Sequence, residues 1–297
     1  MTEFHEPVMV REVTDLLCSA PSPMVLDCTL GDGGHSLAVL GRSTGAFVVG
    51  IDVDSEAIGV AERRLRGAFP GRFIVRRGDY RELPGVLAWT GVPSVDGVLF
   101  DLGVSSRQLD LPHRGFSYWN EGPLDMRMDR ESPLTAKDIV NTWSEEEIRR
   151  IVREYGEERF AARIAKSIVK ARERHPIQTT RDLAQIIEGA VPGNARRQPI
   201  HPARRTFQAL RIAVNGELSR LGRSLLTAFE LLRPRGVMVV LSYHSLEDRI
   251  AKNAMRSLAD QGRAEILTKK PMTASEMETS SNPRSRSAKL RALLKLE

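Results

Sequence analysis

The sequence has few cysteines and no long apolar segment. Its 297 residues include two cysteines, Cys18 and Cys28, which form neither a disulfide framework nor a metal-ligand spacing. No apolar run is long enough to cross a bilayer, and residues 1–13 lack the apolar region of a signal peptide. We therefore expect a cytoplasmic protein without a structural metal ion.

The composition is that of a folded, basic protein. Hydrophobic residues make up 41% of the chain and charged residues 28%, which allows a sizeable core. The formal net charge of +6 favours an anionic partner such as nucleic acid, although a well-charged solvated surface explains it equally. The length exceeds that of an average domain and indicates one large domain or one domain with an insert.

Short apolar segments in the first third of the chain end in acidic residues. Residues 24–28, 46–52 and 95–101 are expected to be buried strands, with Asp27, Asp52 and Asp101 at their ends. Helical patterns lie between them, including one at 55–66 with Ser55 as its expected N-cap. Strands alternating with helices indicate a parallel sheet, and ligands bind at the carboxyl ends of such strands.

The alternation stops after Asp101 and returns near residue 214. Residues 104–213 contain no apolar strand and show helical patterns at 144–155, 159–174 and 180–191. Beyond them we expect a long helix bent near Gly216 or Gly222 (205–232), a strand (236–242), a helix (245–258), two short strands (264–268 and 288–294) and an exposed loop (273–287). The prediction is an α/β fold with a doubly wound, mostly parallel sheet, built from residues 1–104 and 214–297 and interrupted by an all-helical insert at 105–213.

A glycine-rich loop, Leu30–His35, follows the first expected strand. A dinucleotide motif would need a third glycine where Ser36 stands, and no triphosphate-binding loop is present. S-adenosylmethionine has no phosphate, and loop N–H groups can hold its carboxylate while Asp52 accepts its ribose hydroxyls. Asp79 and Tyr80 can reach the adenine. Each feature taken singly has a structural explanation: a tight turn for the glycine loop, a helix cap for the acidic residues and packing for Tyr80. The order of these features along the chain nevertheless favours S-adenosylmethionine.

Residues 73–75 form a further short expected strand, so the strand over 95–101 is the fourth. Residues 101–110 follow it as a second constellation, and methyltransferases that modify exocyclic amino groups hold a short acid- or serine-led turn at this position. The exocyclic amino nitrogen of cytosine is a poor nucleophile because its lone pair is delocalised into the ring. Carbonyls and a carboxylate that accept hydrogen bonds from its N–H groups can activate the nitrogen, and they can take up its proton. Correct placement of the reacting groups supplies much of the catalysis. No cysteine is required, and neither Cys18 nor Cys28 suits the attack on the ring that C5 methylation needs.

Several long motifs resemble the bacterial small-subunit ribosomal RNA methyltransferase H family, which methylates N4 of a decoding-centre cytidine. The matching stretches are His5–Val8, Asp27–Ser36, Phe100–Asp110, Arg114–Ser117, Gly122–Met128, Tyr155–Ala161, His201–Ile212, Ser242–Arg249 and Asn282–Arg291. The resemblance implies an rRNA (cytosine-N4-)-methyltransferase with a class I S-adenosylmethionine-dependent fold and an inserted helical domain. It implies cofactor contacts by Gly33, Gly34, His35, Asp52, Tyr80, Asp101 and Gln108.

The expected catalytic residues are Asp101, Ser105 and His244. His244 follows a strand at the same sheet edge, where it can orient the base or relay a proton, or can be a satisfied structural histidine. Expected RNA contacts are Arg196, Arg197, Arg204, Arg205, Arg284 and Arg286, with a solvated helix face as the alternative. Phe116, Tyr118 and Trp119 can stack on a base or be buried.

Two other functions fit the same residues. The fold can methylate a protein or a small molecule, against which the basic clusters argue. It can also serve as a non-catalytic RNA-binding scaffold, which would not bind S-adenosylmethionine. The expected partner is small-subunit ribosomal RNA, recognised by the insert, without a membrane. The sequence leaves a monomer and a homodimer both open.

Overall fold

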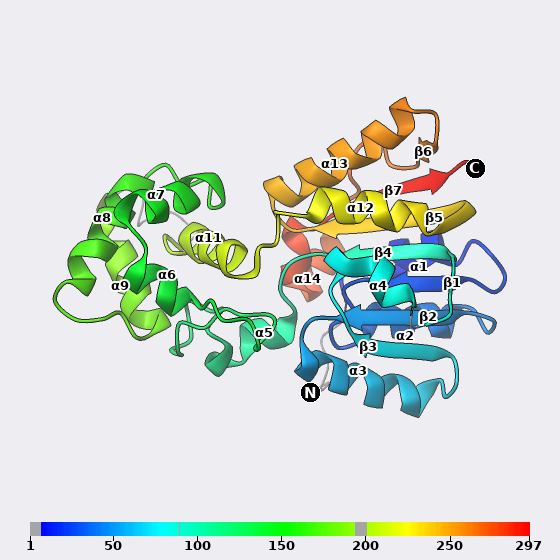
Figure 1. The fold of residues 1–297 in the computed structure, drawn as a ribbon, viewed down its shortest axis with the longest axis horizontal. Coiled ribbons are helices and arrows are strands. Elements are labelled where there is room, and N and C mark those ends of the chain that lie inside the picture. Colours follow the sequence, from blue (N-terminus) through cyan, green and yellow to red (C-terminus); the bar gives the residue numbers. More distant parts are fainter. Residues whose placement is uncertain (1–6, 89, 194–200) are drawn as a thin grey trace. The chain divides into compact units, whose positions relative to one another are not determined.

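The structure is a computed structural model that describes residues 7–88, 90–193 and 201–297. The chain divides into two compact units: the first comprises Met1–Gly103 and Leu218–Glu297, and the second comprises Val104–Glu217. Figure 1 labels the elements of both units along the chain. Within the described residues, no helix combines the length and apolarity that crossing a membrane requires.

The first unit contains one seven-stranded sheet, in the order β3-β2-β1-β4-β5-β7-β6 (Figure 1). The strands are β1 Met24–Asp27, β2 Phe47–Asp52, β3 Phe73–Arg77, β4 Val95–Asp101, β5 Leu232–Ser242, β6 Ala264–Ile266 and β7 Lys289–Lys295. The strands from β1 to β5 pair in parallel, and β7 runs antiparallel to both β5 and β6. The predicted doubly wound, mostly parallel class I fold is confirmed.

Both faces of this sheet are covered, which explains why its central strands are apolar almost throughout. On one face Val49 and Phe100 pack in a core with α12 (Leu221–Glu230) and α13 (Ser245–Asp260). On the other face the strands pack against three helices, α1 Val10–Leu17, α2 Gly34–Arg42 and α3 Ser55–Ala68. The remaining helical segments of the unit are η1 Tyr80–Glu82, α4 Leu83–Ala88, α14 Glu276–Ser281 and η3 Pro283–Ser287.

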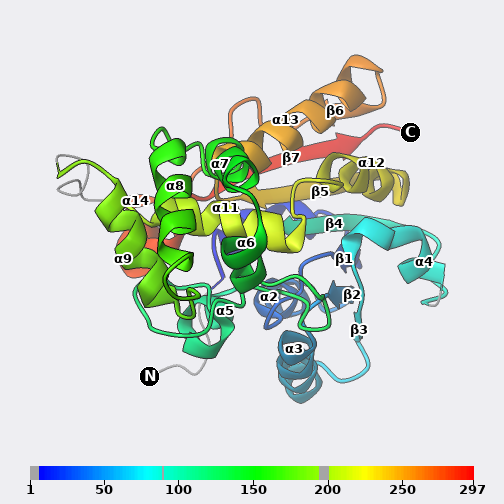
Figure 2. The same ribbon diagram turned by 60° about the vertical axis from the view of Figure 1, so that its left-hand side comes forward.

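The second unit is helical and has a core of its own. Its elements are α5 Ser106–Asp110, η2 Pro112–Arg114, α6 Ala136–Thr142, α7 Glu145–Glu154, α8 Ala161–Arg172, α9 Thr180–Ala190 and α11 Arg204–Asn215. Helix α11 packs against α6 and α7, and α8 packs against α7 and α9 (Figure 2). Side-chain capping boxes start α5, α6, α7 and α9, so the sequence fixes where each of these helices begins.

Three details differ from the sequence-based expectations. Asp54 rather than Ser55 caps α3, because its carboxylate accepts the N–H of Glu56 at 3.0 Å. The expected helix over 205–232 is two helices, α11 and α12, since Gly216 has a left-handed φ of 60° that ends α11. The expected loop over 273–287 contains α14 and η3, and its Ser285 is fully buried.

Candidate active site

The glycine loop joins β1 to α2 at the carboxyl edge of the sheet. Gly31 and Gly33 have φ values of 52° and 76°, a left-handed conformation that glycine adopts without strain. At Gly34 a Cβ atom would lie 2.7 Å from Cγ of Pro7. The loop therefore needs glycine at position 34 for its own packing, independently of any ligand.

Two backbone donors of this loop are used within the protein. Gly31 N–H donates to Oδ2 of Asp52 at 2.8 Å, and Gly33 N–H donates to the carbonyl of Leu30 at 2.8 Å. The first amides of α2 have no carbonyl partner within the helix, because a helix leaves its first N–H groups unsatisfied. These amides, rather than those of Gly31 and Gly33, are the donors that suit a ligand carboxylate.

Asp52 ends β2 and ties it to the glycine loop. Its Oδ1 accepts the N–H of Asp54 at 2.9 Å, and its Oδ2 accepts the N–H of Gly31. Burial raises the pKa of this carboxyl from 3.8 to about 6. A carboxylate has about four acceptor positions, so these two bonds leave capacity for two ribose hydroxyls.

The carboxylate of Asp27, which ends β1, is buried and hydrogen-bonded within the protein. It is 2% exposed, and its carboxylate accepts the hydroxyl of Ser36 at 2.7 Å and the N–H of Thr29 at 3.2 Å. Burial is the largest cause that raises its pKa. The Thr29 hydroxyl accepts the N–H of Asp101 at 2.6 Å. Asp27 and Thr29 thus fix the loop and connect the ends of β1 and β4.

Asp101 lies between two side chains from distant parts of the sequence. Its Oδ1 accepts the hydroxyl of Tyr243 at 2.7 Å, and its Oδ2 lies 3.4 Å from Nε2 of His35. His35 is 5% exposed, and neither of its ring nitrogens has a hydrogen-bond partner within the described part of the chain. Polar groups from α2, β4 and the end of β5 therefore converge at one edge of the sheet.

Tyr243 is the residue of this group that sequence reasoning did not assign. Burial, followed by the charge of Asp101, raises the pKa of its hydroxyl well above 10, so the hydroxyl stays protonated and donates. The usable signal is its position directly after β5, at the edge where the other strand-end residues lie. Its aromatic character alone suggests only packing.

Tyr80 and Asp79 follow β3 at the same edge. The Tyr80 ring packs edge-on against Phe100, with centroids 5.6 Å apart, and belongs to the border of the core. The Asp79 carboxylate caps η1 and accepts the Arg81 Nε–H at 2.6 Å. Asp79 is thus engaged by Arg81, whereas Tyr80 offers an aromatic surface next to the strand ends.

The residues at this edge fit S-adenosylmethionine. The buried His35 nitrogens, the acceptor capacity of Asp52 and the α2 amides give polar partners for an amino acid and a ribose, and Tyr80 gives a surface for adenine. Asp52 ends a strand as predicted and Tyr80 follows β3, whereas His35, expected in the glycine loop, lies in the first turn of α2. Their contacts with the cofactor stay predictions.

Ser105 and Gln108 belong to the helical unit, where they form the capping box of α5. Ser105 Oγ accepts the N–H of Gln108 at 3.2 Å, and Gln108 Oε1 accepts the N–H of Ser105 at 3.0 Å. This reciprocal pair accounts for the burial of Gln108. The catalytic role of Ser105 and the cofactor role of Gln108 stay predictions.

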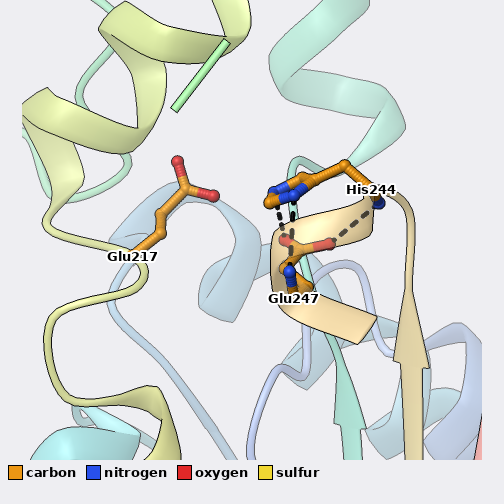
Figure 3. A group of neighbouring side chains, drawn as sticks. All are labelled: Glu217, His244 and Glu247. Carbon is orange, nitrogen blue, oxygen red and sulfur yellow. Dashed lines mark hydrogen bonds and ion pairs between the residues drawn. The ribbon is translucent and has the colours of Figure 1, made fainter. Parts of the chain in front are cut away.

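His244 is the N-cap of α13 (Figure 3). Its Nδ1 accepts the N–H of Glu247 at 3.5 Å, and its Nε2 lies 3.1 Å from Oε1 of Glu247. Glu247 Oε2 in turn accepts the N–H of Tyr243 at 2.9 Å. The two side chains are 8% and 2% exposed. This geometry gives His244 a helix-capping role, and its catalytic role stays a prediction.

The predicted RNA-binding arginines lie in separate segments. Arg204 and Arg205 are exposed at the start of α11, and Arg205 Nη1 donates to the carbonyl of Glu157 at 3.2 Å. In η3, Arg286 is exposed and Arg284 is partly buried. Arg196 and Arg197 lie outside the described residues.

Comparison with known proteins gives matches along the whole chain. The model of the MraW methylase family matches residues 2–296. Proteins named ribosomal RNA small subunit methyltransferase H are similar at full length. That of Symbiobacterium thermophilum is 47% identical and aligns over 100% of this chain and 98% of its own. That of Geobacter sulfurreducens is 49% identical over 100% of both. A solved O-methyltransferase from Bacillus cereus, in complex with SAH, has a TM-score of 0.47 at 10% identity, covering 99% of this chain and 84% of its own.

Proposed function

Because the chain belongs to the MraW methylase family, we propose that it transfers a methyl group from S-adenosylmethionine to N4 of a cytidine in small-subunit ribosomal RNA. The full-length relatives named for methylation of small-subunit RNA support this substrate. The structural observation that carries the proposal is the Asp101 carboxylate, fixed by the Tyr243 hydroxyl and next to His35 at the carboxyl edge of the sheet.

The cofactor site is assembled from the ends of β1 and β2. The first amides of α2 hold the carboxylate of the amino-acid end, and Asp52 accepts the ribose hydroxyls. His35 supplies a buried polar contact, and Tyr80 packs against the adenine. When bound, S-adenosylmethionine supplies an electrophilic methyl group on a sulfonium.

Asp101 orients the amino group that receives the methyl. Its carboxylate accepts a hydrogen bond from an N–H group of the cytosine amine. This contact localises the nitrogen lone pair and would orient it toward the methyl carbon. Methyl transfer would form the carbon–nitrogen bond, and the electron pair of the broken carbon–sulfur bond would be retained on the sulfur of S-adenosylmethionine. The amine becomes more acidic, and Asp101 accepts its proton. Tyr243, which stays protonated, keeps the carboxylate in this orientation.

The helical unit is the proposed substrate-recognition part, with Arg204 and Arg205 on its surface. Arg284 and Arg286 of η3 add positive charge to the first unit. Guanidinium groups that contact phosphates position RNA without reading its sequence. Together with the net charge of +6, they favour RNA over a protein or a small molecule as the substrate. A ribosomal substrate also supports a cytoplasmic location for the enzyme.

The test uses purified full-length protein, labelled S-adenosylmethionine and small ribosomal subunits from cells that lack the modification. We expect label in the RNA, recovered as N4-methylcytidine by mass spectrometry after digestion. Asp101→Asn is the matched control, since it keeps the shape of the side chain but cannot accept the proton in the same way. Label in ribosomal protein, or no transfer by the wild type, would contradict the proposal.

A further inference from the structure

Four aromatic rings of the helical unit form a connected cluster that reaches the surface. Phe207 lies inside, 3% exposed, with its ring centroid 5.6 Å from that of Tyr118. Tyr118 stacks on His201 at 4.7 Å, with an interplanar angle of 22°. Trp119 meets the His201 ring at 4.6 Å and the Tyr118 ring at 5.5 Å. We name these four residues the aromatic cluster, and its outermost member is Trp119.

Trp119 is exposed although the loop that carries it is well anchored. Its side chain is 70% exposed, and it is the one aromatic among the large exposed apolar side chains of the described residues. The Ser117 hydroxyl accepts the N–H of both Trp119 and Asn120 at 3.2 Å. The Thr180 hydroxyl donates to the carbonyl of Asn120 at 2.7 Å and accepts the N–H of Gly122 at 3.0 Å. The indole is therefore presented to solvent from a fixed backbone.

His201 is held as firmly as the loop. Its Nδ1 accepts the N–H of Ala203 at 3.1 Å, and its Nε2 lies 2.9 Å from a carboxylate oxygen of Glu188. The imidazole thus has a fixed orientation and supports the indole edge-on. Rigid aromatic side chains lose little conformational entropy when a planar ligand stacks on them.

Positive charge lies between two members of the aromatic cluster in the chain, His201 and Phe207. The N–H of Arg204 donates to the carbonyl of His201 at 3.1 Å, so the first turn of α11 starts beside the imidazole. Arg204 and Arg205 are both exposed there. An exposed indole whose supporting imidazole lies next to a helix turn with exposed arginines suits single-stranded nucleic acid, which is bound by base stacking and by phosphate contacts.

We infer that Trp119 is a stacking platform for an unpaired base of the RNA substrate, with Arg204 and Arg205 contacting phosphates of the same strand. This inference rests on the proposed function, because it assumes an RNA substrate. It adds a subsite for the RNA that is separate from the contacts made to the methyl-accepting amine.

The first test follows the fluorescence of Trp119 during titration with a single-stranded RNA oligonucleotide. The chain has three tryptophans, so the variant Trp89→Phe/Trp143→Phe leaves Trp119 as the single indole. We expect saturable quenching by RNA. Unchanged Trp119 fluorescence at saturating RNA, with binding followed separately by anisotropy of labelled RNA, would overturn the inference.

The second test compares substitutions at Trp119 in the otherwise wild-type chain. We expect Trp119→Ala and Trp119→Leu to weaken RNA binding about tenfold and Trp119→Phe to weaken it much less, since stacking needs a π-face and not merely apolar surface. The slope of log affinity against log salt concentration is expected to stay unchanged in all three variants. In Arg204→Ala/Arg205→Ala the magnitude of this slope is expected to fall by about two. Equal affinity of Trp119→Ala and wild type would overturn the inference.

Separate readouts distinguish this inference from the proposed function. If wild-type protein methylates small subunits but Trp119→Ala binds RNA normally, only the stacking subsite is wrong. If RNA quenches Trp119 but no methyl group is transferred, the proposed function fails and the subsite stands. If the protein self-associates without RNA and Trp119→Ala abolishes this association, the indole is an interface between copies and the inference is overturned.

Discussion

The Tyr243 hydroxyl donates to Oδ1 of Asp101 at 2.7 Å, across a separation of 142 residues in the sequence. The bond joins the residues at the ends of two neighbouring parallel strands, β4 and β5. Glu247 Oε2 accepts the Tyr243 N–H, so the start of α13 also fixes the backbone of the tyrosine. The orientation of the Asp101 carboxylate is therefore set by the protein before any substrate binds.

Tyr243→Phe is expected to lower turnover while leaving cofactor affinity nearly unchanged. A hydrogen bond to a charged group contributes about 1.5–3 kcal/mol, which corresponds to a fall of roughly ten- to a hundredfold in kcat if the bond orients the carboxylate in the transition state. Single-turnover methyl transfer measures the rate, and calorimetry with S-adenosylmethionine measures the cofactor affinity. The control is Tyr80→Phe, which removes a hydroxyl at the same edge but keeps its ring. A normal rate for Tyr243→Phe would remove this residue from the site.

Asp52→Ala is expected to weaken S-adenosylmethionine binding strongly. The variant removes the acceptor for the ribose hydroxyls and also releases the Gly31 N–H that Asp52 now holds. Loss of charge-assisted hydrogen bonds suggests a weakening of at least about tenfold. Calorimetry measures the affinity, and Asp54→Asn serves as the control because asparagine also caps a helix well. Unchanged affinity in Asp52→Ala would refute the ribose role.

The raised pKa of Asp52 gives opposite pH trends for stability and for cofactor binding. Burial raises this pKa to about 6 from 3.8, so the folded protein binds the proton more tightly than the unfolded chain. The contribution of Asp52 to stability is therefore fully present below about pH 3.8 and is lost as the pH rises through about 6. Cofactor affinity should rise over the same window, because ribose recognition needs the ionised carboxylate.

Comparison with Asp52→Asn isolates this titration from the other groups. Denaturant unfolding and calorimetry between pH 4 and 7.5 measure the two trends in each protein. We expect the difference in stability between the two proteins to change with pH between about 4 and 6, and the pH dependence of affinity to flatten in the variant. Identical pH profiles for both proteins would show that the Asp52 pKa is not raised.

Gly34→Ala tests whether this glycine serves packing or the cofactor. A Cβ at position 34 would lie 2.7 Å from Cγ of Pro7, so the variant is expected to lose stability and to displace the segment before α1. Pro7→Gly removes the clashing ring, and the double variant should recover most of the thermal stability and the cofactor affinity. If the double variant stays stable but binds no cofactor, Gly34 is required by the ligand itself.

The sequence predicted which residues lie at the carboxyl edge of the sheet better than it predicted the hydrogen bonds between them. Strand-end acids and the glycine loop are local patterns, and β4 has the predicted bounds Val95–Asp101. The Tyr243–Asp101 bond depends on tertiary pairing of β4 with β5, which no local pattern encodes. The break at Gly216 was also ambiguous, since a glycine within a helical pattern is compatible with either a bend or a left-handed end, and only the fold selects the latter.

His244 provides the sharpest distinction between a structural and a catalytic residue. As the N-cap of α13 it accepts the N–H of Glu247, a function that asparagine also performs well. His244→Asn should therefore keep both thermal stability and turnover. His244→Ala should lose about 1 kcal/mol of stability through the missing cap, with a secondary fall in turnover if the backbone of Tyr243 loosens. Thermal unfolding and single-turnover rates measure these effects. A proton relay through the imidazole would instead require that both variants lose turnover equally, while His244→Asn stays stable.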